Sequence, residues 1–247
     1  MLTDDKDFLM RRFSLLSALG VFAITCATIA NANITLSQAI IFFQPGERPI
    51  QTIEVINIDD ERTFAVKTNV VEVTNPGGQD QVSTKSKSLV VAPNAFEVAA
   101  QNSRNVRLML RNRNESDIEK VYRVTFTPEA PTRTVEEEKP DGIKTKIDII
   151  VGMGALILVP PKDIKYKLEA SREGKKLLFT NNSNISTEIQ PRTICKTENE
   201  CFRFNGTRIY PGRNWQYELP DGFEKIGLAL SVRAAGKYSA VEFSPID

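Results

Sequence analysis

Hydrophobic and polar residues alternate along most of the chain in short runs that are separated by turns. In residues 63–73, Phe64 and Val66 share one face, which is the pattern of a half-buried strand. Residues 105–110 and 121–127 alternate in the same way. Beyond the N-terminal segment, no run has the 3.6-residue period of an amphipathic helix. Many short strands with frequent turns predict an all-β fold built from sandwiches.

The tandem prolines Pro160 and Pro161 divide this pattern into two sets of strands. Proline lacks the amide hydrogen that a central strand needs, so we expect a short hinge there. The expected domains are residues 33–160 and residues 161–247. Within the first domain, residues 129–146 are charged and proline-containing, without an apolar period, and predict a long flexible loop.

The N-terminus has the features of an export signal. Arg11 and Arg12 precede an apolar stretch over residues 13–30, and Ala30-Asn31-Ala32 is a small-residue cleavage site. We therefore expect residues 1–32 to be removed on export, leaving Asn33 as the mature N-terminus. The alternative is an uncleaved membrane anchor, which the polar interruptions of the apolar stretch and the immediate cleavage site disfavour.

Composition and charge exclude several classes of function. Histidine is absent, which removes Ser-His-Asp catalysis and histidine metal ligands. Lys and Arg number 32 and Asp and Glu number 31, whereas sequence-independent nucleic-acid binding needs surplus positive charge. The acidic run 136–138 is typical of a solvated loop and lacks the alternating pattern of a calcium site. We expect no enzyme activity, no cofactor, no metal and no small-molecule substrate.

Two cysteines, Cys195 and Cys201, follow the signal segment. In an oxidising compartment we expect them to form a disulfide that closes a short loop and contributes about 2–3 kcal/mol. Two free thiols remain an alternative. A redox-active or zinc-binding pair is disfavoured, because the spacing is not C-x-x-C and further ligands are lacking.

The segment 147–159 is an unusually long aliphatic run. Its alternate positions include Ile147, Ile149, Val151 and Met153, and toward Val159 both faces are apolar. One interpretation is a central core strand. The other is an edge strand whose N-terminal half offers these four side chains to a partner protein by strand addition.

Three parts of the sequence form recognisable motifs: Ser88–Pro93 with Phe96–Val98 and Asn105–Leu108, then Glu119–Pro128, then Ile147–Val159 followed by Pro161. Together they resemble the PapD-like periplasmic chaperones of chaperone–usher pili. The resemblance covers residues 33–160 and, more loosely, 161–247. The residues Tyr122–Phe126 and the long loop point toward the archaic or alternate branch, which has a long loop before the last strand.

This resemblance implies two immunoglobulin-like domains and a periplasmic location. It also implies donor-strand complementation, in which the chaperone lends a strand to a pilus subunit that lacks its own last strand, and then delivers the subunit to an outer-membrane usher. Counting back from Pro161 places the donor positions on Ile147, Ile149, Val151 and Met153. No nucleic acid or small molecule is implied as a partner.

The chain departs from this family where the subunit's C-terminal carboxylate is held. The family's arginine and lysine anchors align with Ile40 and Leu156. A buried carboxylate still needs a cation, and the candidates are Arg107, Arg123 and Lys146. Glu119 matches the family acid that ties the domains together. Its usual arginine partner aligns with Pro160, which leaves that pairing open.

The main alternative is a pilus structural subunit or adhesin. Such proteins are also exported, and also combine immunoglobulin-like domains with a disulfide. The two-domain pattern and the match over 147–159 favour the chaperone.

Overall fold

The computed structural model describes residues 34–112, 114–129 and 150–245, and every regular element in these ranges is a β-strand. The alternating pattern of the sequence is thereby confirmed as an all-β fold. No helix in the described part is long and apolar enough to cross a membrane. The predicted signal peptide, residues 1–32, and most of the predicted long loop lie outside the described residues.

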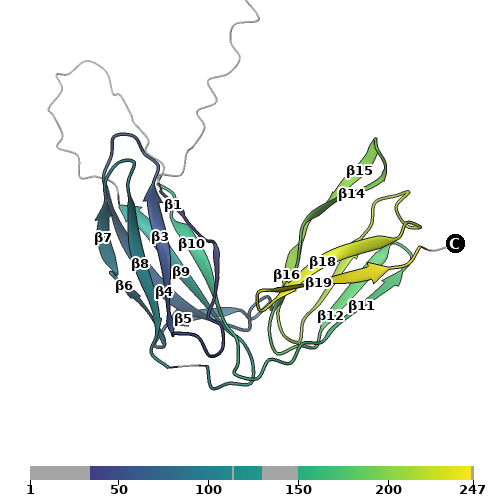
Figure 1. The fold of residues 1–247 in the computed structure, drawn as a ribbon, viewed down its shortest axis with the longest axis horizontal. Coiled ribbons are helices and arrows are strands. Elements are labelled where there is room, and N and C mark those ends of the chain that lie inside the picture. Colours follow the sequence, from purple (N-terminus) through teal and green to yellow (C-terminus); the bar gives the residue numbers. More distant parts are fainter. Residues whose placement is uncertain (1–33, 113, 130–149, 246–247) are drawn as a thin grey trace, which may run out of the picture. The chain divides into compact units, whose positions relative to one another are not determined.

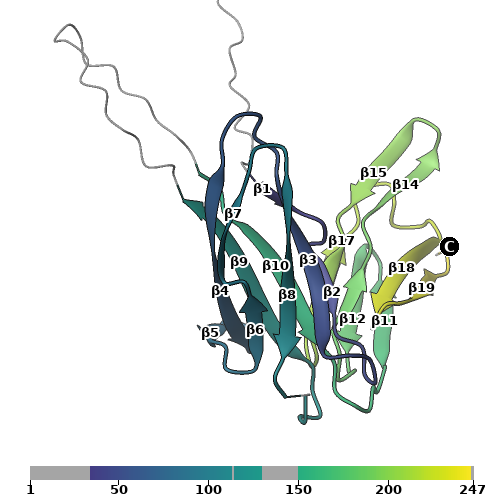
Figure 2. The same ribbon diagram turned by 60° about the vertical axis from the view of Figure 1, so that its left-hand side comes forward.

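The strands before Pro160 form two sheets. These strands are β1 (Ile34–Leu36), β2 (Ile40–Phe42), β3 (Ile50–Asn57), β4 (Phe64–Thr74), β5 (Val82–Lys85), β6 (Leu89–Ala92), β7 (Ala95–Val98), β8 (Ser103–Leu110), β9 (Lys120–Glu129) and β10 (Met153–Val159). One sheet has the order β1-β3-β8-β6, and the other has the order β2-β10-β9-β4-β5, with β7 also paired to β4. Figure 2 shows β3 and β8 in front of β9 and β10.

The core of this sandwich lies between the two sheets. Phe64 on β4, Val106 on β8 and Phe126 on β9 are almost fully buried in one cluster. Their outward neighbours Lys67 and Arg107 are exposed, because side chains alternate between the two faces of a strand. The inward positions predicted from the sequence for these strands are therefore confirmed.

The chain changes sheets near its start. Ile34 on β1 pairs with Asn57 of β3, whereas Ile40 on β2 pairs in parallel with Leu156 of β10. β1 is therefore the outer strand of one sheet, and the very short β2 is the outer strand of the other. This crossing leaves part of one edge of the β10-containing sheet, at Met153–Ala155, uncovered by any described strand.

The strands after Pro161 form sheets of their own (Figure 1). They are β11 (Leu168–Glu173), β12 (Lys176–Asn181), β13 (Thr187–Ile189), β14 (Arg192–Thr197), β15 (Glu200–Phe204), β16 (Thr207–Ile209), β17 (Asn214–Glu218), β18 (Leu228–Ala234) and β19 (Lys237–Phe243). The strand orders are β11-β12-β17, β16-β13-β18-β19 and the hairpin β14-β15. Phe179, Phe204 and Leu230 belong to a separate core. Among the described residues, no sheet joins strands from both sides of Pro160.

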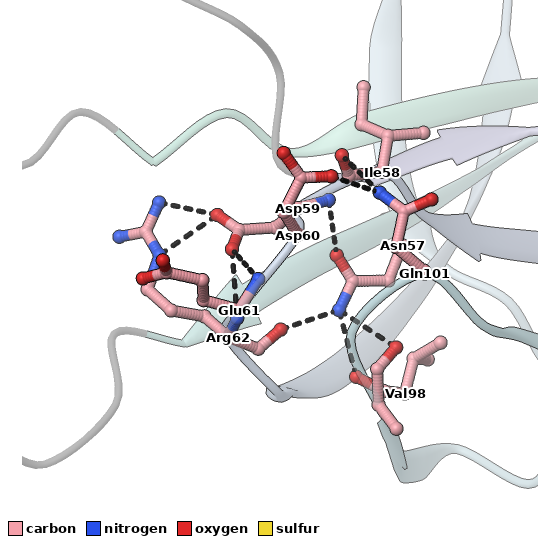
Figure 3. Close-up of polar contacts among 9 residues, drawn as sticks. Asn57, Ile58, Asp59, Asp60, Glu61, Arg62, Val98 and Gln101 are labelled. Carbon is pink, nitrogen blue, oxygen red and sulfur yellow. Dashed lines mark hydrogen bonds and ion pairs between the residues drawn. The ribbon is translucent and has the colours of Figure 1, made fainter.

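A polar cluster fixes the loop between β3 and β4 (Figure 3). The side-chain amide of the buried Asn57 donates to the carbonyl oxygens of Arg62, Val98 and Ala99, at 2.7, 3.1 and 3.0 Å. Arg62 donates from Nε and Nη2 to the Asp59 carboxylate, at 2.8 and 2.6 Å. These bonds hold the pKa of Asp59 well below its ordinary value, at about 2.

We predict that this carboxylate makes stability depend on acid. Because the folded pKa of Asp59 is about 2 and the ordinary value is 3.8, its contribution is present above pH 4 and is lost as the pH falls toward 2. The shift corresponds to about 2.5 kcal/mol at most, which screening around the partly exposed Arg62 reduces to roughly 1 kcal/mol. Urea unfolding at neutral and acidic pH measures it. Asp59→Asn is expected to lower the free energy of unfolding at neutral pH and to flatten this acid dependence. An unchanged acid dependence in the variant would contradict the assignment.

Candidate functional site

Strand β10 is covered on one side along its whole length and on the other side only in part. It pairs with β9 from Met153, opposite Phe126, to Val159, opposite Lys120. On its other side, β2 reaches only the residues 156–158. Within the described residues, the stretch 153–155 therefore has no strand beside it on that side. This open stretch of main chain is the candidate functional site.

The hydrogen bonds of β10 show which amides face the open side. The amide of Leu156 donates to the carbonyl of Ala39 at 2.8 Å, and the carbonyl of Leu158 accepts from the amide of Phe43 at 2.9 Å. Even-numbered residues of β10 thus present their main-chain groups away from β9. Because peptide groups alternate along a strand, the N–H and C=O of Gly154 also point toward the open side.

The odd-numbered side chains form one row that leaves the core as it approaches the open stretch. Ala155 and Ile157 are fully buried in the core of the sandwich. Met153 is partly buried against the same core, and Val151 is 39% exposed. Ile147 and Ile149 lie outside the described residues. The parity predicted from the sequence therefore agrees with the structure within β10, from Met153 to Val159.

The extent of the strand differs from the sequence expectation. A single strand over 147–159 was the interpretation of the pattern, but residues 150–152 are not in a strand, and β10 begins at Met153. β2 gives no support there, and Gly152 and Gly154 lower the intrinsic preference for strand geometry. The two interpretations of this segment each describe one half: a central strand at Leu156–Leu158 and an edge strand at Met153–Ala155.

A family model matches this part of the chain. The model of the pili and flagellar-assembly chaperones, PapD N-terminal domain, matches residues 33–165, which are more than half of the chain. The chain belongs to this family. It is therefore a chaperone of pilus assembly, and its partners are pilus subunits; the family match overturns the alternative of a structural subunit.

Individual similar proteins carry fimbrial names, and solved structures show the same fold. The chaperone is 28% identical over 187 residues to a CS1 fimbrial subunit of Escherichia coli, in an alignment that covers 71% of the chaperone and 77% of that protein. The class 5 fimbriae chaperone CfaA superimposes with a TM-score of 0.53 at 20% identity, over 87% of the chaperone and 100% of that chain. A chain from the complex of the Salmonella enterica SafA pilin with the SafB chaperone has a TM-score of 0.61 at 14% identity, over 87% and 98%. At these identities the superpositions show the fold, two immunoglobulin-like sandwiches.

Arg123 lies on the outer face of the β10-containing sheet, in one row with Leu156 and Ile40. Ile40 pairs with Leu156, and Leu156 pairs in turn with Arg123 of β9. Directly opposed residues place their side chains on the same face of a sheet. Arg123 is exposed and has no ion pair among the described residues. A cation therefore lies one strand away from Leu156 and two strands away from Ile40.

The other two anchor candidates are not brought to this place. Arg107 is on β8, where it pairs with Thr52 of β3 and Ala92 of β6, on the outer face of the opposite sheet. Lys146 lies outside the described residues. The sequence alone did not separate Arg107 from Arg123, because both point outward on a strand and only the sheet pairing distinguishes them.

Glu119 is 7% exposed and follows the turn that leads into β9. Its carboxylate accepts a hydrogen bond from the amide of Ser186 at 3.1 Å, and its own amide donates to the carbonyl of Asn184 at 2.9 Å. Burial raises the pKa of Glu119, and the bond to Ser186 opposes that shift. Glu119 therefore contacts the part of the chaperone beyond Pro160 through main-chain groups.

Cys195 and Cys201 form the predicted disulfide. They pair directly across the hairpin of β14 and β15. The bond joins two strands that are already neighbours, so its role is to hold the exposed hairpin together.

Proposed function

We propose that the chaperone captures pilus subunits by donor-strand complementation at the open side of β10. The observation that carries this proposal is the uncovered stretch Met153–Ala155, which has paired main chain on one side only. The donated side chains are Ile147, Ile149, Val151 and Met153, which would enter a groove that the subunit's missing strand leaves open.

The proposal explains why the chaperone has an uncovered aliphatic strand edge, which would otherwise promote unwanted association. Exposed edges invite pairing with other chains, and proteins normally shorten, charge or cover them. Here the main-chain groups of Gly154 are available to an incoming strand, and Val151 offers an exposed aliphatic side chain beside them. Burying such side chains in a subunit stabilises the complex by about 1.5–3 kcal/mol each, before the entropy of ordering and association is subtracted.

Arg123 is the proposed anchor for the subunit's C-terminal carboxylate. A cation held beside the apolar residues Ile40 and Leu156 gains strength as the subunit excludes water from the contact. Of the other two candidates, Arg107 lies on the opposite sheet and Lys146 lies outside the described residues.

We therefore predict that Arg123→Glu weakens the affinity for pilus subunits by about tenfold or more, because it replaces attraction by repulsion of the carboxylate. Arg107→Glu is the matched control, since it makes the same change on the outer face of the opposite sheet. Titration calorimetry with a purified subunit measures both. Equal losses in the two variants would contradict the anchor assignment.

We further propose that the chaperone acts in the periplasm, after removal of residues 1–32, and passes its subunit to an outer-membrane usher. It would do so without enzymatic activity or a cofactor. The transfer of the subunit from chaperone to usher would be driven by the subunit's own completed folding. A partner that binds the folded state of the subunit preferentially shifts the subunit's folding equilibrium toward that state.

Co-expression with an exported pilus subunit tests the proposal. The subunit is expected to accumulate as a soluble complex that co-purifies with the chaperone in equal amounts, and to be degraded or aggregated without it. A subunit that folds and accumulates equally well when expressed alone would overturn the proposal.

A further inference from the structure

The outer face of the β1-β3-β8-β6 sheet carries a group of residues that subunit capture does not use. At its centre is an apolar row, Ile50, Met109 and Val90, formed by direct pairing across β3, β8 and β6. Four cations surround this row: Arg107, Arg111, Lys85 and Lys87. We call these seven residues the basic–apolar face.

Burial and register define the apolar row. Ile53 and Val55 of β3 point into the core, so Ile50 and Thr52 point outward, and Ile50 is 49% exposed. Met109 and Val90 are half-buried on the same outer surface. With strands about 4.8 Å apart, the row is roughly 10 Å wide, which matches one or two side chains of a bound peptide.

The cations lie close to this row. Arg107 precedes Met109 by two residues on β8, so it lies about 7 Å along the strand on the same face. Arg111 follows the end of β8 at Leu110, and its amide donates to the carbonyl of Ser88 at 2.9 Å. Lys85, Lys87 and Arg111 line a shallow hollow together with Val90. All four cations are exposed, and none has an ion pair among the described residues. Glu54, farther along the face, accepts a hydrogen bond from the Ser103 hydroxyl.

We propose that the basic–apolar face docks an extended, acidic segment of a second partner protein, one that places an apolar side chain on the Ile50–Met109–Val90 row. A single exposed isoleucine needs no explanation. Four unpaired cations around an apolar row indicate a binding surface, because this arrangement is complementary to an apolar side chain flanked by carboxylates. Arginine and methionine are also enriched at protein interfaces.

A protein fits this face better than an anionic membrane does. Membrane-surface elements bury a broad, projecting apolar surface in the lipid. Here only Ile50 stands well out of the sheet, while Met109 and Val90 form a shallow floor. The face also lies in the opposite sheet from β10, so it does not compete with a subunit for the open side. The inference is independent of donor-strand complementation.

Amide NMR spectra of the purified mature chain test the proposal, with a synthetic peptide in which leucine alternates with aspartate as the probe. We expect shifts centred on Ile50, Val90 and Met109 that weaken with added salt. A peptide with lysine in place of aspartate is expected to cause none there. In the double variant Arg107→Glu, Arg111→Glu, the affinity for the acidic peptide should fall at least about tenfold.

Three results would overturn the proposal: no shifts with up to about 1 mM acidic peptide, shifts at Met153–Ala155 instead, or equal binding by the double variant. Vesicles of phosphatidylglycerol test the membrane alternative. If the unmodified chaperone binds these vesicles but not the acidic peptide, and the double variant does not bind the vesicles, the face binds lipid and the proposal is wrong. The affinity of the double variant for a purified pilus subunit, measured separately, should equal that of the unmodified chaperone. If the double variant lost affinity for the subunit, Arg107 and Arg111 would belong to the subunit-capture site, and the proposal of a separate docking face would be wrong.

Discussion

Replacing Val151 by aspartate is expected to abolish subunit capture while the chaperone remains folded. Val151 is 39% exposed and makes no part of the core, so the substitution leaves the free sandwich intact. In the complex, the same side chain would have to enter an apolar groove, where an unpaired carboxylate costs several kcal/mol in addition to the lost burial. We expect the affinity to fall by a factor of roughly 100 or more, as measured by titration calorimetry with a purified subunit.

Ile150→Asp is the matched control for this variant. It introduces the same charge one residue away, but on the opposite parity of the segment, and we expect it to retain most of the affinity. Thermal unfolding of both variants should resemble that of the unmodified chaperone. If Ile150→Asp abolishes capture and Val151→Asp does not, the donor row has been assigned to the wrong face.

Replacing Gly154 by proline is expected to have an effect of similar size through the main chain alone. The Gly154 amide faces the open side, so proline removes a donor that only an incoming strand would use, and its ring stands where that strand must pair. Pairing of β10 with β9 uses the odd-numbered amides and is not interrupted. We expect capture in a co-purification assay to fall at least about tenfold, with a near-normal unfolding transition.

Gly154→Ala separates this effect from the loss of glycine. A Cβ atom at Gly154 would meet only the Val124 carbonyl oxygen, at 3.9 Å, which is an ordinary contact. The alanine variant keeps its amide hydrogen and is expected to capture subunits normally. A proline variant that also captures normally would show that the open side of β10 does not pair with the subunit.

Much of the first sandwich could be predicted from the sequence because its strands alternate cleanly. Phe64 and Val66, and likewise Tyr122 and Phe126, are buried on the predicted faces. The face shared by Met153, Ala155 and Ile157 was also predictable, since a period of two fixes which residues of a strand share a face. The disulfide followed from the compartment and the cysteine count.

The sequence does not predict which strands pair with each other, and this pairing determines which residues lie at the functional site. Alternation says that Arg107 and Arg123 both point outward, but it does not say that they lie on opposite faces of the sandwich. The beginning of β10 at Met153 is likewise set by how far β2 extends, which no local pattern records. The basic–apolar face is formed by three strands that are far apart in sequence, so it appears only when the sheet is assembled.

Two features of the second sandwich have local causes that the alternation of residues does not record. The first is that β15 and β16 are separate strands. Gly206 lies between them, where the chain changes its pairing partner from β14 to β13. A Cβ atom there would come within 2.1 Å of the Ile189 carbonyl oxygen, so the close approach requires glycine. The second is β14, whose side chains are mostly exposed, so that its sequence shows little alternation.

Hydrogen exchange at the Gly154 amide tests the central claim most directly. In the free chaperone this amide should exchange rapidly, while the neighbouring amides of Met153 and Ala155, which face β9, should be protected. Adding a purified pilus subunit should protect Gly154 and leave its neighbours unchanged. Protection of Gly154 in the free chaperone, or continued rapid exchange in the complex with the subunit, would contradict donation of this strand.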